Sequence, residues 1–195
     1  EVGVGHADRI ILYDRSPLHS SARMWWLLTL FGASNVALLD GGLEAWAKTG
    51  HPVITGAAGA TETPGLFVAQ PDLARVRTLR EVRAHVEEGD AQIVDARSPG
   101  RFTGREPEPR LGVEPGHIPG ALNLPYNRMF EGDGRWKSPQ AIAAEFAAAG
   151  VDPARPMVAT CGSGITACVL AFGAERIGGV MPVYDGSWTE WGSDP

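Results

Sequence analysis

The segment Pro156-Met-Val-Ala-Thr-Cys161-Gly-Ser-Gly-Ile-Thr166 indicates the fold class, because it joins three different local patterns. Its first six residues form a short, mostly apolar run after a proline, which predicts a buried strand that ends at Cys161. A glycine-rich loop follows, and an apolar stretch over 166–177 then predicts a helix. A strand, a short loop and a helix in this order form the unit from which parallel α/β sheets are built.

The same order of elements is present near the N-terminus, so the chain contains an internal repeat. In this alignment Asp14 corresponds to Cys161, and both copies close with similar sequences, Asp40-Gly-Gly-Leu-Glu-Ala-Trp46 and Asp185-Gly-Ser-Trp-Thr-Glu-Trp191. The predicted strand, helix and strand lie at 9–14, 21–31 and 35–39 in the first copy, and at 156–161, 166–177 and 180–184 in the second.

Only the second copy is preceded by a further half-domain. Its pattern predicts a helix at 78–88, a strand at 92–95 and a helix at 139–149 with Ser138 as the N-cap. We expect the first copy to have lost the corresponding half. The predicted fold class is therefore α/β, a mostly parallel sheet with helices on both faces, in a tandem repeat whose first copy is truncated.

A small, polar, Gly/Pro-rich stretch from Thr55 to Gly65 cannot bury a core, and it places the boundary between the copies. The sequence thus predicts three parts. Residues 1–54 form the C-terminal part of a first domain, 55–70 a linker, and 71–195 a complete second domain.

Composition excludes several classes of function. The chain has 195 residues, a net charge of −6 and scattered basic residues, which favours a small-molecule substrate over nucleic acid or an anionic membrane. No apolar run is long enough to span a bilayer, and the first residues lack a signal-peptide pattern, so we expect a cytoplasmic protein. The spacing of its two cysteines, Cys161 and Cys168, fits neither a disulfide framework nor a metal site.

Cys161 is the candidate nucleophile. A thiol at a strand end, before a Gly-x-Gly loop and a helix N-terminus, faces backbone N–H groups that stabilise an anion. The alternative is a small buried apolar residue, which is the role that we expect for Cys168 within its helix. Cysteine phosphatases use a similar loop, but they need an arginine where this chain has Ala167, so phosphate chemistry is disfavoured.

Three motifs resemble the rhodanese superfamily, and specifically its two-domain 3-mercaptopyruvate sulfurtransferases. Cys161-Gly-Ser-Gly-Ile-Thr-Ala167 is similar to the family's active-site loop. Glu114-Pro-Gly-His-Ile-Pro-Gly-Ala121 is similar to its internal hallmark, and Asp185-Gly-Ser-Trp-Thr-Glu-Trp191 to its C-terminal signature. The resemblance implies a rhodanese fold, a persulfide on Cys161, and no metal or organic cofactor.

The resemblance also implies a substrate site. Arg101 and Arg110 match the arginines that hold the donor's carboxylate, although each could instead form a surface ion pair with Glu106, Glu108 or Glu114. The loop residues Gly162, Gly164, Ile165 and Thr166 would bind the reacting sulfur, and Ser163 would pass a proton or merely shape the loop. Arg97, beside Asp95, and His117, within a turn, are expected to be structural.

The leading hypothesis is an enzyme that moves sulfur from 3-mercaptopyruvate, through Cys161, to thioredoxin, a low-molecular-weight thiol or cyanide. Uncharged residues at 162 and 163 favour this donor over thiosulfate, which basic loop residues would hold. Two alternatives remain, a thiosulfate-preferring rhodanese and a non-catalytic module that binds a partner protein. Asp14 cannot form a persulfide, so we expect the first copy to be non-catalytic and completed, if at all, by a separate N-terminal chain.

Overall fold

The computed structural model describes residues 3–56 and 65–193. The first copy contains a short parallel sheet and two helices. These elements are β1 (Ile10–Leu12), α1 (Ser21–Leu30), β2 (Val36–Leu38) and α2 (Gly42–Lys48). The second copy contains β3 (Val76–Arg77), α3 (Leu79–Glu88), β4 (Gln92–Asp95), α4 (Pro99–Phe102), β5 (Leu122–Asn123), α5 (Pro139–Ala148), β6 (Met157–Thr160), α6 (Ala167–Arg176), β7 (Val183–Tyr184) and α7 (Ser187–Trp191). Single 3₁₀ turns lie at Leu73–Arg75 and Tyr126–Met129.

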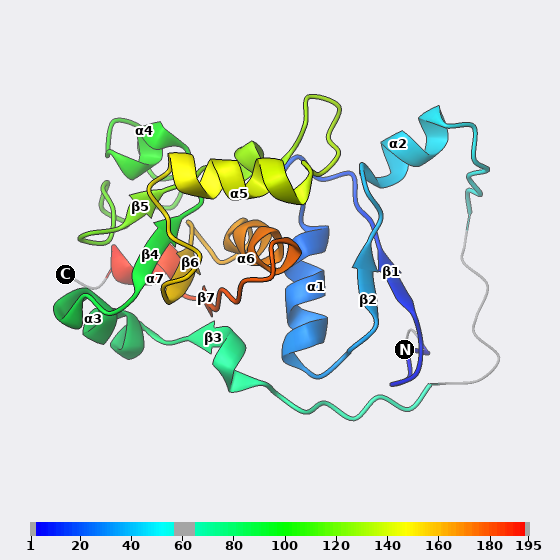
Figure 1. Ribbon diagram of the computed structural model, residues 1–195, viewed down its shortest axis with the longest axis horizontal. Coiled ribbons are helices and arrows are strands. Elements are labelled where there is room, and N and C mark those ends of the chain that lie inside the picture. The colour runs from blue at the N-terminus through cyan, green and yellow to red at the C-terminus, as the bar shows by residue number, and fades with distance from the viewer. Residues whose placement is uncertain (1–2, 57–64, 194–195) are drawn as a thin grey trace.

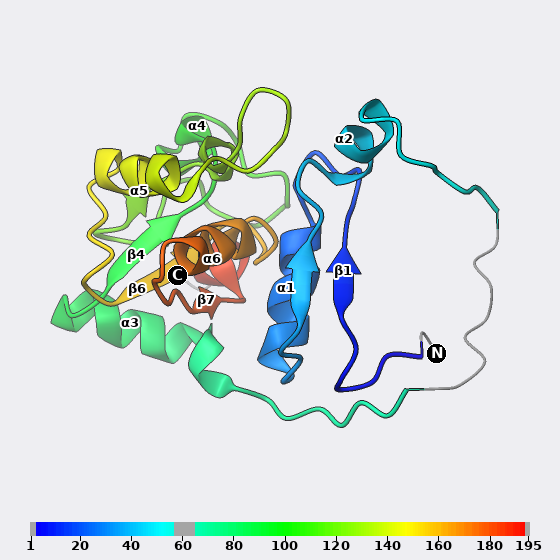
Figure 2. The same cartoon turned by 45° about the vertical axis from the view of Figure 1, so that its right-hand side comes forward.

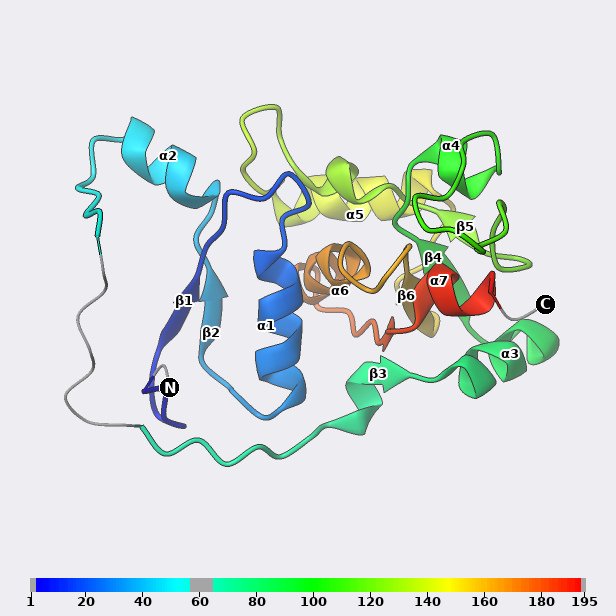
Figure 3. The ribbon, with the colours of Figure 1, turned by 180° about the vertical axis from the view of Figure 1, so that it is seen from behind.

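The second copy is built on a five-stranded sheet of order β3-β7-β6-β4-β5, in which every pair is parallel. Successive residues of each strand face opposite sides, so Val94 and Ala159 join the core beneath α5 and α6, whereas Ile93 and Val158 pack toward α3 and α7. Figure 1 shows α5 and α6 together on one side, and Figure 3 shows α7 from behind. This arrangement confirms the predicted class, a parallel sheet with helices on both faces.

Local sequence explains where the helices begin. Thr78 caps α3, accepting a hydrogen bond from the N–H of Glu81, whose carboxylate accepts one from the N–H of Thr78. Ser138 caps α5 in the predicted position, and Pro139 occupies its first turn without losing a helical hydrogen bond.

The last strand is shorter than predicted. It begins at Val183 rather than 180, because Val180 is exposed and Pro182 has no N–H to donate.

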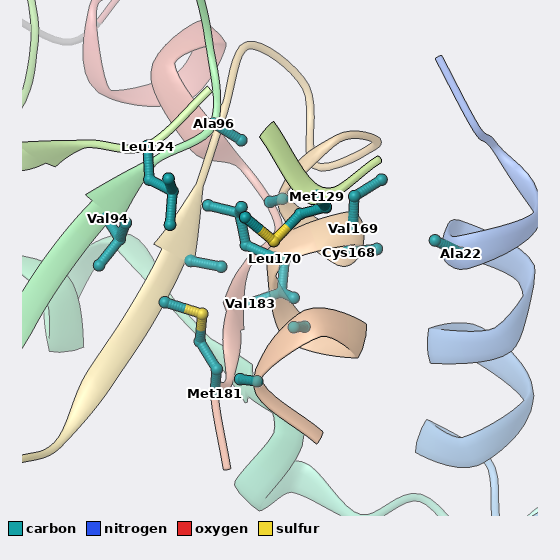
Figure 4. Close-up of a cluster of buried hydrophobic side chains, with 14 of the residues drawn as sticks. Ala22, Val94, Ala96, Leu124, Met129, Cys168, Val169, Leu170, Met181 and Val183 are labelled. Atoms are coloured by element: carbon teal, nitrogen blue, oxygen red, sulfur yellow. The ribbon is translucent and has the colours of Figure 1, made fainter. Parts of the chain in front are cut away.

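The first copy packs its helix against the second copy. Figures 1 and 2 both show α1 between the β1–β2 pair and α6. Trp25 and Trp26 are buried, and the ring of Trp25 meets Phe172 of α6 edge to face, with 4.8 Å between centroids. Figure 4 shows Ala22 of α1 facing the part of α6 that carries Cys168 and Val169. A single hydrophobic core therefore joins the two copies.

Only part of the predicted linker between the copies lies within the described residues. Of the predicted linker, 55–70, residues 57–64 lie outside the described part of the chain. The end of this segment returns to the start of the chain, where the ring of His6 stacks on Phe67 and its Nε2 accepts a hydrogen bond from the N–H of Val68. Within the described ranges, no helix is long and apolar enough to cross a membrane.

We expect residues 1–54 not to fold alone. Their two-stranded sheet leaves Ile11 and Tyr13 exposed, and α1 would lose the cover that α6 gives to Trp25 and Trp26. Denaturant unfolding of the isolated peptide, followed by tryptophan fluorescence, is expected to show no cooperative transition. A monomeric peptide that unfolds cooperatively would contradict this prediction.

Candidate active site

Cys161 lies directly after β6, one of the inner strands of the sheet, and the loop 162–166 connects it to α6. The carboxyl ends of parallel strands form the edge of an α/β sheet where ligands bind. The whole cysteine residue is 2% exposed, and it borders a pocket together with the loop that follows it. This position is the one predicted from the strand–loop–helix pattern.

The closing segment 185–191 donates hydrogen bonds to two carbonyl groups at the start of this loop. The N–H of Trp188 donates to the carbonyl oxygen of Cys161 at 2.9 Å, and the N–H of Thr189 donates to that of Gly162 at 2.9 Å. The hydroxyl of Thr189 also donates to the Gly162 oxygen. In a trans peptide the C=O and the following N–H point in opposite directions. The N–H groups of Gly162 and Ser163 therefore point away from the N–H groups of Trp188 and Thr189.

Ser187, the first residue of α7, forms hydrogen bonds with backbone groups at both ends of the Cys161–Gly164 segment. Its hydroxyl oxygen accepts hydrogen bonds from the N–H groups of Cys161, at 3.2 Å, and Gly164, at 3.0 Å, and donates to the carbonyl of Tyr184, at 2.8 Å. It lies 3.9 Å from the Cys161 sulfur. Ser187 has a φ of 53°, unusual for a residue with a side chain, so its surroundings hold it in this position. Ser187 lies within the C-terminal motif 185–191, but no local pattern marks it as a site residue.

The pocket in front of the loop has a volume of about 250 Å³ and gathers nearly all the predicted site residues. Gly164 is the exception, because it is buried and does not line the pocket. Leu18, from the first copy, also borders the pocket. The lining residues are Leu18, Arg101, Glu108, Pro109, Arg110, Cys161, Gly162, Ser163, Ile165, Thr166 and Thr189.

The two predicted arginines differ in their surroundings. Arg101 is already paired with Glu108, with 2.5 Å from Nη2 to Oε2 and 3.1 Å from Nε to Oε1. Arg110 is exposed and donates to the hydroxyl of Thr189 at 2.9 Å. It forms no ion pair within the described ranges. Arg101 thus forms one of the ion pairs considered from the sequence while it borders the pocket, whereas Arg110 keeps its charge available there.

Glu108 links the pocket to a buried ionic network. It accepts a hydrogen bond at 2.8 Å from Arg97, whose side chain is fully buried and also pairs with Asp95 at 2.6 Å. Arg97 lies outside the pocket, with its guanidinium 4.8 Å from the centre of the Trp188 ring, which fits its expected structural role. Burial raises the pKa of the Glu108 carboxyl, but the guanidinium groups of Arg101 and Arg97 together outweigh this effect and hold the pKa below its usual value. The carboxylate therefore stays charged near neutral pH.

The other residues considered from the sequence are Cys168, His117 and Ser163. Burial raises the pKa of Cys168 to about 12, and its thiol donates to the carbonyl of Gly164 at 3.1 Å, so it is an inert part of the core. The ring of His117 stacks on Phe102 and bonds its carbonyl through Nδ1 at 2.8 Å, outside the pocket. The hydroxyl of Ser163 borders the pocket and has no hydrogen-bond partner among the residues described.

The corresponding loop of the first copy holds a carboxylate where the second copy holds the thiol. Oδ1 of Asp14 accepts a hydrogen bond from the N–H of Ser16 at 2.9 Å, and Oδ2 accepts one from the N–H of Ser21, the first residue of α1. A pocket of about 290 Å³ borders this loop as well. Both loops are thus built to surround a negative group.

Among described residues, no cluster of three or more histidine, cysteine or acidic side chains is suited to bind a metal ion.

A family model for the rhodanese-like domain matches residues 2–49 and 78–194, and these two segments coincide with the two copies of the repeat. The chain belongs to the rhodanese family. Among curated proteins, 3-mercaptopyruvate sulfurtransferase of Homo sapiens is 45% identical over 193 residues, and thiosulfate sulfurtransferase of Bos taurus is 38% identical over 194 residues. Each alignment covers 97% of this rhodanese chain, but only 64% and 65% of the relative's length.

Solved structures of the family show the same fold. Tum1 of Saccharomyces cerevisiae superposes with a TM-score of 0.86 at 30% identity, covering 97% of this chain and 68% of that one. SseA of Escherichia coli, described as a 3-mercaptopyruvate sulfotransferase, superposes with a TM-score of 0.80 at 34% identity, covering 95% and 69%. This rhodanese chain therefore spans about two thirds of the proteins to which it is similar.

Two glycines of the loop offer a test of its geometry. Gly164 has a φ of +76°, and a Cβ there would lie 2.7 Å from Oδ1 and 2.8 Å from the backbone oxygen of Asp185. Gly164→Ala is expected to lower the free energy of unfolding by about 2–4 kcal/mol and to disrupt the loop. A Cβ at Gly162 meets only the movable end of Arg101, at 2.6 Å from Nη2.

Gly162→Ala is therefore the matched control, with stability within about 1 kcal/mol of the parent protein. Urea unfolding of both variants measures the difference. Equal stability of the two variants would contradict the described conformation of Gly164.

Proposed function

We propose that this chain is a sulfurtransferase that takes sulfur from 3-mercaptopyruvate as a persulfide on Cys161 and passes it to a thiol or to cyanide. One observation carries the proposal. The Cys161 thiol and two guanidinium groups border the same pocket, together with the loop that joins the thiol to the N-terminus of α6. This arrangement suits a substrate with a carboxylate at one end and a transferable sulfur at the other.

In the first step the Cys161 thiolate attacks the sulfur of 3-mercaptopyruvate, and the new S–S bond forms as the C–S bond breaks. The electron pair of the broken bond leaves as the enolate of pyruvate, which takes the proton that the donor's thiol has lost. The persulfide carries the negative charge. The loop N–H groups and the N-terminus of α6 stabilise this charge, and the hydroxyl of Ser163 borders the space in which the proton moves.

In the second step the acceptor attacks the outer sulfur of the persulfide. The S–S electron pair returns to the Cys161 sulfur, and the acceptor becomes a persulfide or, for cyanide, thiocyanate. No net oxidation occurs in either step, so no redox cofactor is needed. Thioredoxin and low-molecular-weight thiols are the proposed acceptors, and the cytoplasm is the proposed location.

The preference for 3-mercaptopyruvate over thiosulfate follows from where the positive charges lie. The residues beside Cys161, Gly162 and Ser163, are uncharged, and the cations of the pocket come instead from Arg101 and Arg110. Thiosulfate is a compact dianion that needs cations next to its sulfur. Mercaptopyruvate places its carboxylate away from its sulfur, where an arginine can pair with it.

In this proposal residues 71–195 form the catalytic domain and residues 1–54 belong to a non-catalytic one. The Asp14 carboxylate occupies the place of the nucleophile in the first copy and already accepts the hydrogen bonds of its loop. A carboxylate cannot carry sulfur as a persulfide.

Intact-mass measurement after incubation with 3-mercaptopyruvate tests the proposal directly. The protein is expected to gain the mass of one sulfur atom, dithiothreitol to remove it, and Cys161→Ser to prevent the gain. Loading by thiosulfate alone would favour the thiosulfate-preferring alternative. A folded protein that neither donor loads would instead be the non-catalytic binding module.

A further inference from the structure

Arg23 belongs to the first copy, yet its guanidinium group contacts the cysteine loop of the second. It lies on α1, and its Nη1 donates to the carbonyl oxygen of Gly164 at 3.4 Å and forms a close ion pair with Asp185. The guanidinium carbon also stacks 4.6 Å from the centre of the Trp26 ring, which packs it in place. The side chain is 23% exposed and does not border the cysteine pocket.

The hydrogen bond to Gly164 orients one particular peptide group. The Gly164 oxygen accepts from both Arg23 and the thiol of Cys168, on the side of the loop away from the pocket. Because the C=O and the next N–H of a trans peptide point in opposite directions, holding this oxygen turns the N–H of Ile165 toward the pocket. Ile165 borders the pocket beside Cys161. Gly164 adopts a φ of +76°, which is open to glycine because it has no side chain. The same lack of a side chain means that contacts to the backbone must hold this peptide group in place.

The ion pair has a second consequence. Asp185 lies so close to the loop that its Oδ1 would be 2.7 Å from a Cβ on Gly164. Without Arg23, this carboxylate would be an unpaired negative charge beside a loop that must stabilise a second negative charge. Arg23 is the cation that Asp185 contacts in the described part of the chain.

We infer that Arg23 is a positioning residue for sulfur transfer, through which the non-catalytic copy acts on the catalytic one. It fixes the Gly164–Ile165 peptide with its N–H toward the Cys161 sulfur, and it neutralises Asp185. The inference rests on the proposed function in one respect, that the negative group held by the loop is the sulfur of Cys161. The first copy then completes the anion site as well as the hydrophobic core.

Arg23→Met tests this role, because methionine keeps an unbranched apolar chain over Trp26 and removes the charge and the hydrogen bond. Misplacing one stabilising donor is expected to lower kcat about 10- to 100-fold. KM for 3-mercaptopyruvate is expected to change less than about 3-fold, since Arg23 lies outside the pocket that binds the donor. Arg23→Lys keeps the charge and is expected to recover part of the lost kcat.

Asp40→Ala is the matched control. Asp40 aligns with Asp185 and accepts a hydrogen bond at 2.8 Å from the N–H of Trp136, so it also joins the two copies, but away from the cysteine loop. Its loss is expected to leave kcat unchanged. If Arg23→Met and Asp40→Ala lower thermal stability alike and neither changes kcat, Arg23 is only an interface contact and the inference fails.

A readout without any sulfur donor separates this inference from the proposed function. The alkylation rate of Cys161 is measured with anionic iodoacetate and with neutral iodoacetamide, on the folded chain. The ratio of the two rates reports the electrostatic potential at the sulfur, and Arg23→Met is expected to lower it. If no donor loads the parent chain, the proposed function fails, yet a lowered ratio would still support the role of Arg23. An unchanged ratio would overturn that role.

Discussion

Replacing Cys161 by serine is expected to abolish sulfur transfer. A serine hydroxyl is not ionised near neutral pH and cannot form a persulfide, so no covalent intermediate remains. Removal of a covalent nucleophile commonly lowers kcat by at least about 10⁴-fold, and here the reaction is expected to fall to the uncatalysed level. Release of pyruvate from 3-mercaptopyruvate, with a thiol as acceptor, measures the loss.

The second cysteine provides the control for this experiment. Cys168 is fully buried in α6, and burial raises the pKa of its thiol to about 12, so it cannot replace Cys161. Cys168→Ala is expected to stay active, because Arg23 still holds the Gly164 oxygen and neutralises Asp185, with a loss of stability from the smaller side chain. Turnover by Cys161→Ser, or complete inactivity of a well-folded Cys168→Ala, would contradict the assignment of the nucleophile.

Arg110→Ala is expected to lower kcat/KM for 3-mercaptopyruvate about 10- to 150-fold. This range corresponds to the loss of one charge-assisted contact of about 1.5–3 kcal/mol. Arg110 has no carboxylate partner among the residues described, so its contact with a donor does not require another ion pair to break. The rate at which iodoacetamide alkylates Cys161 is expected to stay nearly unchanged, because the sulfur and its loop remain in place.

Arg101→Ala is expected to cause a loss in the same range, together with a second effect. Arg101 holds Glu108 at 2.5 Å, so its removal leaves that carboxylate at the pocket with Arg97 as its partner. With one cationic partner in place of two, Glu108 would repel the donor's own carboxylate more strongly. Arg105→Ala is the control, since Arg105 is exposed on the same loop but does not border the pocket. If thiosulfate proves the better donor, or both variants keep full activity, the assignment of 3-mercaptopyruvate is wrong.

Most of the fold could be predicted from local sequence patterns. The helix α3 begins one residue after the predicted start because a Thr78 cap and a Glu81 partner mark its first turn. The strand β4 matches its prediction at both ends, since its residues form a short apolar run between polar segments. The position of Cys161 follows in the same way, from the end of one pattern and the beginning of the next.

The parts of the site that could not be predicted depend on contacts between distant segments. Glu108 was considered only as a surface partner for the arginines, yet it is nearly buried and joins Arg101 to the core. Ser187 and Arg23 contact the cysteine loop from 26 and 141 residues away along the chain. Neither has a local pattern that distinguishes it from an ordinary serine or a surface arginine. Such contacts are visible only in the folded chain.

The carboxylate of Asp14 makes the two loops respond differently to turnover. The Asp14 carboxylate is part of the chain, so it cannot dissociate from the first loop. The first loop therefore always contains its anion. Under the proposed function, the anion of the second loop instead becomes one sulfur atom longer when Cys161 is loaded and shorter again when the acceptor removes that atom. The group that the second loop surrounds would therefore change in size during each turnover. The first loop stays unchanged beside it and anchors α1, the helix that carries Arg23.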